Sequence, residues 1–367
     1  MLPPPSTVDA VDALRLAPAL SGQGLRGAIL YWDGQVVDDA RLVVAIARTA
    51  AAHGASILTY CQVRRLVDQG AHVRDELSGE SFELRARHTV NATGVWAGDL
   101  APDARVVPSK GAHVIVPAAK LGHPQAAVTV PVAGEKGRWV FALPGEGGRV
   151  TVGVTDDHYV GPLDAPSVTA RDVESLISQI SLALSVPLTP SEVIGQFAGL
   201  RPLVAGKAGS TADLSRRHLI LEDPDRRAIT LVGGKLTTYR AMAEEAVDRI
   251  TARPGVIAGP CRTREISLVG AASADQLRGI DAPPRLVRRY GTEASRLLEL
   301  GAEEPQLRRS LGDGVSTIGA ELRFAVEHEL ALTLDDLLDR RTRVGLVRTQ
   351  RDAAIHAAAG ILEATVV

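Results

Sequence analysis

The chain has 367 residues, 45% hydrophobic and 23% charged, which is enough for two or three globular domains. Its net charge of -2 argues against nucleic acid as the main partner, and Cys61 and Cys261 form no CxxC motif, so we expect reduced thiols and a cytoplasmic protein. No apolar run of about eighteen residues predicts a membrane-spanning helix, whereas docking at a membrane surface stays open.

A glycine-rich motif near the start of the chain lies in the wrong setting for a nucleotide. Residues 22–27 match GxGxxG, but a dinucleotide fingerprint follows a buried strand and opens a helix. Here Pro18 comes shortly before the glycines, and residues 27–32 have a strand pattern. We therefore expect no phosphate-binding loop, while residues 8–16 predict a short helix.

The next segment predicts one helix and several short strands. Asp38 and Asp39 precede an amphipathic pattern over residues 40–53, and Gly54 ends it. These acidic residues are therefore expected to cap the helix. Strand patterns follow at 56–60, 62–66, 71–74 and 81–85, which predict a small hairpin or meander.

Two further patterns place small residues at the end of a strand. One strand begins at His88 and ends in Asn91-Ala92-Thr93-Gly94. The other, residues 228–232, leads into Gly233-Gly234-Lys235 and then a helix over 239–250, with Met242, Val247 and Ile250 on one face. Glycines let the backbone approach a ligand, and the N–H groups of a first helical turn attract negative charge, as Lys235 does. A plain exit into a loop and an ordinary tight turn are the alternatives.

The middle of the chain predicts an antiparallel sheet. Alternating patterns at 111–116, 138–143 and 149–155 are expected strands, and residues 169–184 an amphipathic helix that crosses them. Arg201 lies in an apolar strand pattern, and Arg216 and Arg217 lie at the start of another. A buried cation needs an anion, which is either a ligand or one of the chain's 43 acidic residues.

Residues 260–367 predict mostly helices, most clearly at 321–330, 334–340 and 351–362. The pattern over 334–343 is acidic at its start and basic at its end, which suits a helix dipole, and we expect a solvated surface helix. Residues 327–329, Glu-His-Glu, come nearest to a metal-ligand pattern, and we expect them to lie at the surface or in helix packing.

Six motifs occur together in one order: residues 31–42, 91–96, 109–113, 154–156, 199–203 and 233–240. They resemble the FAD-dependent, quinone-linked glycerol-3-phosphate dehydrogenases of the actinobacterial kind, from about residue 8 to the end of the chain. The resemblance implies an α/β fold in three parts. These are a partial FAD-binding domain like that of glutathione reductase and D-amino-acid oxidase (1–104 and 228–255), an antiparallel substrate-binding domain (105–227), and a helical C-terminal cap domain (256–367).

The resemblance also implies an activity and its residues. The family oxidises sn-glycerol 3-phosphate to dihydroxyacetone phosphate by hydride transfer to FAD, and passes electrons to a quinone at the inner face of the cell membrane. The match places Arg201 and Arg216 at the substrate phosphate, His113 as proton acceptor and Lys235 beside the flavin; a satisfied histidine on a sheet face is the alternative for His113. It implies FAD contacts for Val63, Ala92, Thr93, Gly94, Gly234, Lys235, Leu236 and Thr237.

One part of the family pattern is missing. Such enzymes begin with a strand, a true GxGxxG motif and a helix for the ADP half of FAD, whereas the motif of this chain is the one at 22–27. We expect either a separate FAD-binding chain as partner or a truncated, non-catalytic remnant, and in both cases poor solubility of this chain alone. A related flavin amine or amino-acid oxidase is a further alternative, and a homodimer stays open.

Overall fold

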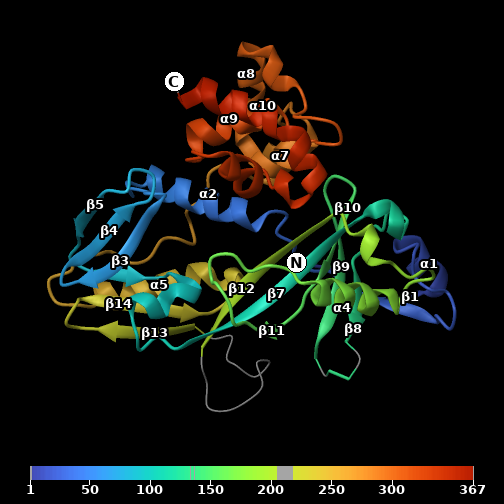
Figure 1. The fold of residues 1–367 in the computed structure, drawn as a ribbon, viewed down its shortest axis with the longest axis horizontal. Helices are drawn as coiled ribbons and strands as arrows, with labels where there is room; N and C mark the ends of the chain where they lie inside the picture. Colours follow the sequence, from blue (N-terminus) through green and yellow to red (C-terminus); the bar gives the residue numbers. More distant parts are fainter. Residues whose placement is uncertain (1, 133, 136, 205–217, 367) are drawn as a thin grey trace.

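The computed structural model describes residues 2–366 apart from 133, 136 and 205–217 (Figure 1). Its described strands form four sheets, and the helices of the last third of the chain gather above them. Helix α2 (Asp39–Ala52) runs between these helices and the sheets (Figure 1). The predicted α/β class, with an antiparallel sheet and a helical C-terminal part, is confirmed.

The largest sheet lies in the middle of the chain, as predicted. Its strands are β7 (Val106–Pro117), β8 (Val128–Pro131), β9 (Trp139–Gly145), β10 (Arg149–Gly153), β11 (Asp157–His158) and β12 (Gly195–Val204). Strand β7 pairs with β10 and β12, all antiparallel. One face of β7 buries Ala112, Val114 and Val116, and the two valines lie in the same apolar core as residues of α4 (Ala170–Ser181). Alternation along β7 thus separates a core face from a second face that is free for chemistry.

A smaller sheet carries the predicted glycine turn. It consists of β13 (His218–Asp223), β14 (Ala228–Gly233) and β6 (Thr89–Asn91), and β14 is parallel to β6. The turn η4 (Leu236–Thr238) and helix α5 (Tyr239–Thr251) follow. Val247 does not share the packed face of α5, because its side chain is 53% exposed and Ala246 is buried instead. The strand, turn and helix order is otherwise as predicted.

The first 90 residues contain two further sheets. A meander of β3 (Cys61–Val67), β4 (Gly70–Asp75) and β5 (Ser81–Arg85) confirms three predicted strands. Residues 56–60 form no strand, since Tyr60 turns away and its hydroxyl donates to Asp336 at 2.9 Å. The predicted helix at 8–16 begins later, as α1 (Ala10–Leu16), because β1 (Ser6–Asp9) pairs with β2 (Gly27–Leu30). The GxGxxG motif therefore leads into an antiparallel strand, as expected.

The C-terminal helices build their own apolar cores. They are α6 (Ala274–Arg278), α7 (Pro284–Tyr290), α8 (Ala294–Glu303), α9 (Gly319–His328) and α10 (Arg348–Val366). The expected solvated helix at 334–343 is wrong. Residues Asp336–Arg341 form a π-helix, η7, whose Leu337 and Leu338 lie fully buried in the same core as residues of α9 and α10. Among the described residues, none of the helices is long and apolar enough to cross a membrane.

Candidate functional site

The free face of β7 and β12 carries the first group of candidate residues. The register places His113 opposite Phe197, Gly111 opposite Gly199, and Ser109 opposite Arg201. Because alternate strand residues share a face, these three pairs stand in a row on one side of the sheet. The middle pair has no side chains. His113 and Arg201 therefore stand on either side of a step that is open at Gly199, while Val154 and the Arg201 guanidinium lie over Gly111.

His113 is held flat between two neighbours. Its ring stacks on Phe197 with centroids 4.7 Å apart and planes 8° from parallel, and its Cδ2 edge lies where a side chain on Gly153 would be. Burial, and after it the nearby charge of Arg201, lower the pKa of His113 from 6.5 to about 4. Its buried Nδ1 has no hydrogen-bond partner among the described residues. The imidazole is thus neutral at pH 7, the state that accepts a proton.

Arg201 keeps part of its guanidinium accessible. Its Nη1 lies 3.2 Å from Asp156 Oδ1, and the Ser109 hydroxyl donates to the same carboxylate oxygen. A Cβ atom on Gly111 would lie 2.7 Å from Arg201 Nη2, so the guanidinium folds back over that glycine. The side chain is 39% exposed. A partly paired guanidinium beside a neutral imidazole can bind an anionic group of a small molecule. The predicted Arg216 lies outside the described residues, as does Arg217.

The second group of candidates lies at the carboxyl ends of β6 and β14. Asn91 is buried and fixes this end: its amide donates to Ala97 O at 3.1 Å, and Thr93 Oγ1 donates to its Oδ1 at 2.7 Å. Gly94 and Gly234 have φ values of 63° and 84°, which favour glycine. Ala92 and the segment Lys235, Leu236, Thr237 are exposed. The predicted Ala92, Thr93, Gly94, Gly234, Lys235, Leu236 and Thr237 are therefore gathered at one sheet end.

This sheet end suits part of a dinucleotide cofactor. Its backbone N–H groups and the open space at Gly94 would let a flat ring or a phosphate approach closely, and Lys235 adds positive charge. Strand β12 contacts both β14 and the turn η1 (Gly94–Trp96), which brings the two groups side by side. Val63 lies apart, half-buried on β3 in the meander. The residues at this sheet end thus fit the flavin half of FAD. Among the described residues there is one parallel strand pair, β6 with β14.

Sequence reasoning missed several residues of the β7–β12 face. Phe197 stands four residues before Arg201 in the same strand, and that even spacing was a signal that both share a face. Asp39 acts on His113 as a nearby negative charge and Arg343 as a positive one, although they lie far apart in the sequence. No local pattern could have connected these two with His113. Lys110, beside the predicted site, is structural, because its Nζ lies 2.6 Å from the buried Asp172 that caps α4.

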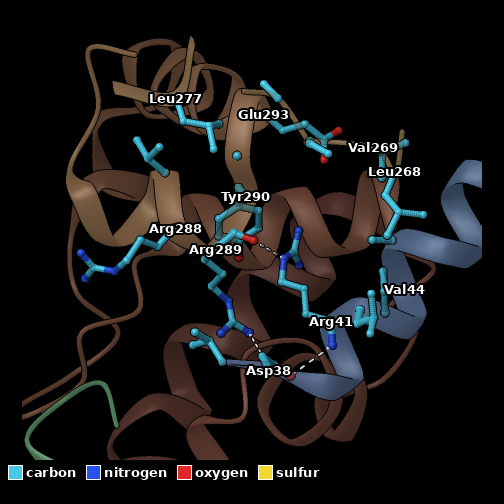
Figure 2. Close-up of a pocket in the computed structure, with 18 of the residues that line it drawn as sticks. Asp38, Arg41, Val44, Leu268, Val269, Leu277, Arg288, Arg289, Tyr290 and Glu293 are labelled. Atoms are coloured by element: carbon cyan, nitrogen blue, oxygen red, sulfur yellow. Dashed lines mark hydrogen bonds and ion pairs between the residues drawn. The ribbon is translucent and has the colours of Figure 1, made fainter. Parts of the chain in front are cut away.

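A large cavity lies elsewhere, between α2 and the C-terminal helices, with a volume of about 880 Å³ (Figure 2). Its walls are mostly apolar, and several of its charged side chains pair with one another. Arg48 binds Glu293 through two contacts of 2.6 and 2.7 Å, and Arg289 binds Asp38 at 2.7 Å. None of the predicted site residues lines it. Within the part of the chain that the structure describes, no cluster of three histidine, cysteine or acidic residues could hold a metal ion.

Comparison with known proteins gives concordant results along the whole chain. Residues 2–249 match the family model of FAD dependent oxidoreductases, and residues 261–366 match that of the C-terminal domain of alpha-glycerophosphate oxidase. Glycerol-3-phosphate dehydrogenase 1 of Mycobacterium tuberculosis (strain ATCC 25618 / H37Rv) is 42% identical, over 97% of this chain and 70% of that protein. Glycerol-3-phosphate dehydrogenase of Mycobacterium leprae is 34% identical, over 93% of this chain and 61% of the relative.

A solved structure with a similar fold is that of the glycerol-3-phosphate dehydrogenase from Bacillus halodurans complexed with FAD. The TM-score is 0.78 and the identity 27%, over 97% of this chain and 75% of that chain. The similarity therefore includes both the sheets and the C-terminal helices.

Proposed function

The chain belongs to the FAD-dependent oxidoreductase family, and from this premise we propose that it oxidises sn-glycerol 3-phosphate to dihydroxyacetone phosphate. The observation that carries the proposal is the pairing of a neutral imidazole, His113, with a partly accessible guanidinium, Arg201, on one open sheet face. A phosphorylated alcohol presents an anion and a hydroxyl proton, which these two groups complement. The names of the relatives, all glycerol-3-phosphate dehydrogenases, support the same substrate.

Each residue has a defined task in this proposal. Arg201 binds the substrate phosphate through its planar fork, with Arg216 as a second proposed contact. His113 takes the proton of the C2 hydroxyl as a general base. Acceptance of the hydride from C2 is the chemistry that a bound FAD would supply. Lys235 and the N–H groups of η4 supply positive potential at the sheet end, where negative charge is stabilised.

The proposed cofactor contacts are Val63, Ala92, Thr93, Gly94, Gly234, Lys235, Leu236 and Thr237. Strand β6 is an edge strand among the described residues, and Val90 on it is 41% exposed. A free edge beside a parallel pair suits a further parallel strand, so we propose that a separate FAD-binding chain, or a second copy of this chain, pairs there. Such a partner would also cover the surface that otherwise lowers solubility.

The proposed electron acceptor is a quinone, reached from the inner face of the cell membrane. A surface of exposed apolar side chains around β2, Ile29, Tyr31 and Trp32, supports peripheral contact with an apolar phase. A flavin amine or amino-acid oxidase is the competing proposal. The match of residues 261–366 to the C-terminal domain of alpha-glycerophosphate oxidase favours the phosphorylated substrate.

An absorption spectrum of the purified chain, recorded after addition of FAD and removal of the free cofactor, tests the proposal. We expect retained flavin absorption that bleaches with glycerol 3-phosphate and not with glycine or proline. Bleaching with an amino acid would favour the competing oxidase. If no flavin is retained, the spectrum is repeated with a separately produced strand–GxGxxG–helix domain, and failure with that domain contradicts the proposal.

A further inference from the structure

An arginine from the C-terminal helical region reaches the β7–β12 face. Arg343 lies between η7 and the short helix η8 (Val344–Leu346), and its Cζ is 5.5 Å from the ring centroid of Phe197. Phe197 in turn stacks on His113. A cation over the face of an aromatic ring is attracted by the ring's negative face, so Arg343 helps to hold Phe197 in place.

Arg343 is also tied to the start of α2. Its Nη1 lies 2.9 Å from Asp39 Oδ1 and 3.7 Å from Asp38 Oδ1. Asp39 is exposed, whereas Asp38 is buried. The guanidinium therefore connects the N-terminus of α2 with the aromatic ring that supports His113.

The backbone at Arg343 is unusual in two respects. Its φ is +58°, a left-handed conformation that is uncommon for a residue with a side chain. It also follows a π-helix, a rare element that occurs most often at functional sites. Such a conformation persists where its surroundings enforce it, and here Leu338 and Val344 are buried on either side. A left-handed turn after a π-helix aims the side chain of Arg343 at the sheet rather than at solvent.

Buried ion pairs fix the distance between the C-terminal helices and α2. Asp38 accepts from Arg41 N at 3.1 Å and from Arg289 Nη2 at 2.7 Å (Figure 2). The same Arg289 nitrogen donates to Arg341 O at 2.6 Å. Arg41 Nη2 also lies 2.7 Å from Glu329, which is almost fully buried. Buried pairs of this kind define a geometry even where they add little net stability. The position of Arg343 is therefore set by a network two residues away from it.

We propose that Arg343 is a positioning residue, which holds the Phe197–His113 stack and joins it to the C-terminal helical region through Asp39. The inference rests on the proposed function only where it gives His113 a part in the reaction. It implies that the C-terminal helical region contributes a residue to the β7–β12 face, so that the helices and the sheet form one active site.

Three charged groups face His113 from three elements: Arg201 on β12, Asp39 at the start of α2, and Arg343 after η7. The two arginines lower its pKa and Asp39 raises it. Loss of Arg343 removes one cation and also releases Asp39 from its partner. Both changes favour the protonated imidazole, so Arg343→Gln is expected to raise the titration midpoint of His113 by about one pH unit.

The experiment follows the ring signals of labelled histidines by NMR during a pH titration of the full chain, with and without FAD. The chain has nine histidines, and His113→Asn identifies the signal that belongs to His113. The matched control is Arg340→Gln, because Arg340 lies in the same π-helix and binds Asp336 at 3.1 Å. We expect a higher midpoint in Arg343→Gln, a lower one in Asp39→Asn, and no change in Arg340→Gln.

The two variants should shift the titration midpoint of His113 in opposite directions, upward in Arg343→Gln and downward in Asp39→Asn. If the substitutions merely exposed the His113 ring to solvent, the midpoint would rise in both. In the flavin-loaded enzyme, Arg343→Gln should lower kcat about tenfold to a hundredfold with KM within about twofold, and Arg343→Lys should restore part of it. An unchanged His113 midpoint in a folded Arg343→Gln protein overturns the inference. If His113→Asn keeps full activity, the proposed function fails, while the titrations still decide the role of Arg343.

Discussion

The β7–β12 face and the turn after β14 are built on different principles. On the face, the chemistry belongs to side chains, and His113 and Arg201 are held by a ring stack and an ion pair. At the turn, the backbone is presented by glycines such as Gly234, with a left-handed φ, while the side chains of Leu236 and Thr237 lie exposed. We therefore expect kcat and KM to depend on the charge and proton affinity of the side chains on the face. Flavin retention should depend on the backbone conformation of the turn.

The largest expected effect separates chemistry from cofactor binding. His113→Asn removes the proton acceptor from the face and leaves the turn intact, so kcat for glycerol 3-phosphate should fall about 10²–10⁴-fold. Retained flavin, measured by absorption per mole of protein, should not change. A variant that loses flavin, or whose kcat stays within a few fold of the parent, would mean that the two regions do not divide the work in this way.

His113 also makes the stability of the folded protein depend on pH. The pKa of His113 is about 4 in the folded protein and near its ordinary value of 6.5 after unfolding. Above about pH 6.5 both states are neutral and the residue has no effect. As the pH falls from about 6.5 to about 4, the unfolded state binds a proton that the folded state does not, which lowers stability by up to about 3 kcal/mol. Urea unfolding of the parent and His113→Asn, at pH 7 and pH 4.5, measures this difference, and equal acid sensitivity would contradict it.

Arg201 tests whether the face binds an anion. Arg201→Ala removes charge-assisted contacts of about 1.5–3 kcal/mol, so KM for glycerol 3-phosphate should rise about 10–150-fold. Arg201→Lys keeps the charge without the planar fork and should lie in between. Arg226→Ala, an exposed arginine paired with Asp223 outside the site, is the control. An unchanged KM in Arg201→Ala, measured by steady-state kinetics, removes Arg201 from the phosphate site.

Periodicity predicted much of the fold because local patterns decide most of its elements. The strand at β14, helix α4 and the meander from β3 to β5 all follow the spacing of apolar residues. The failures occurred where a distant contact overrides the local pattern. The residues around 336 look like a solvated charged helix, but Leu337 and Leu338 enter a core made by α9 and α10. A segment that is acidic at its start and basic at its end could not by its charges alone predict that burial.

The site was predictable in part for the same reason. A histidine and an arginine in two separate strand patterns, and a glycine turn before a helix, can be found from the sequence. Their assembly cannot, because the pairing of His113 with Phe197 depends on the register of β7 and β12. Arg343 is the extreme case, since it reaches this face from the other end of the chain. The proposed contact through Arg216 stays a prediction.

The smallest expected effect compares a glycine from each region. Gly234→Ala forces a side chain into a left-handed backbone, which costs about 1–2 kcal/mol, and the new Cβ would displace the flexible side chain of Met242. We therefore expect lower stability in urea unfolding together with weaker flavin retention. Gly199→Ala is the matched change on the face, where a Cβ meets nothing within 4 Å in an extended strand.

Gly199→Ala should leave stability and flavin retention unchanged and raise KM, because it fills the open step between His113 and Arg201. If both glycines instead affect flavin retention equally, the face and the turn form one continuous cofactor surface. In that case Gly199 would belong to the cofactor-binding surface, and the face would not be a site of side-chain chemistry alone.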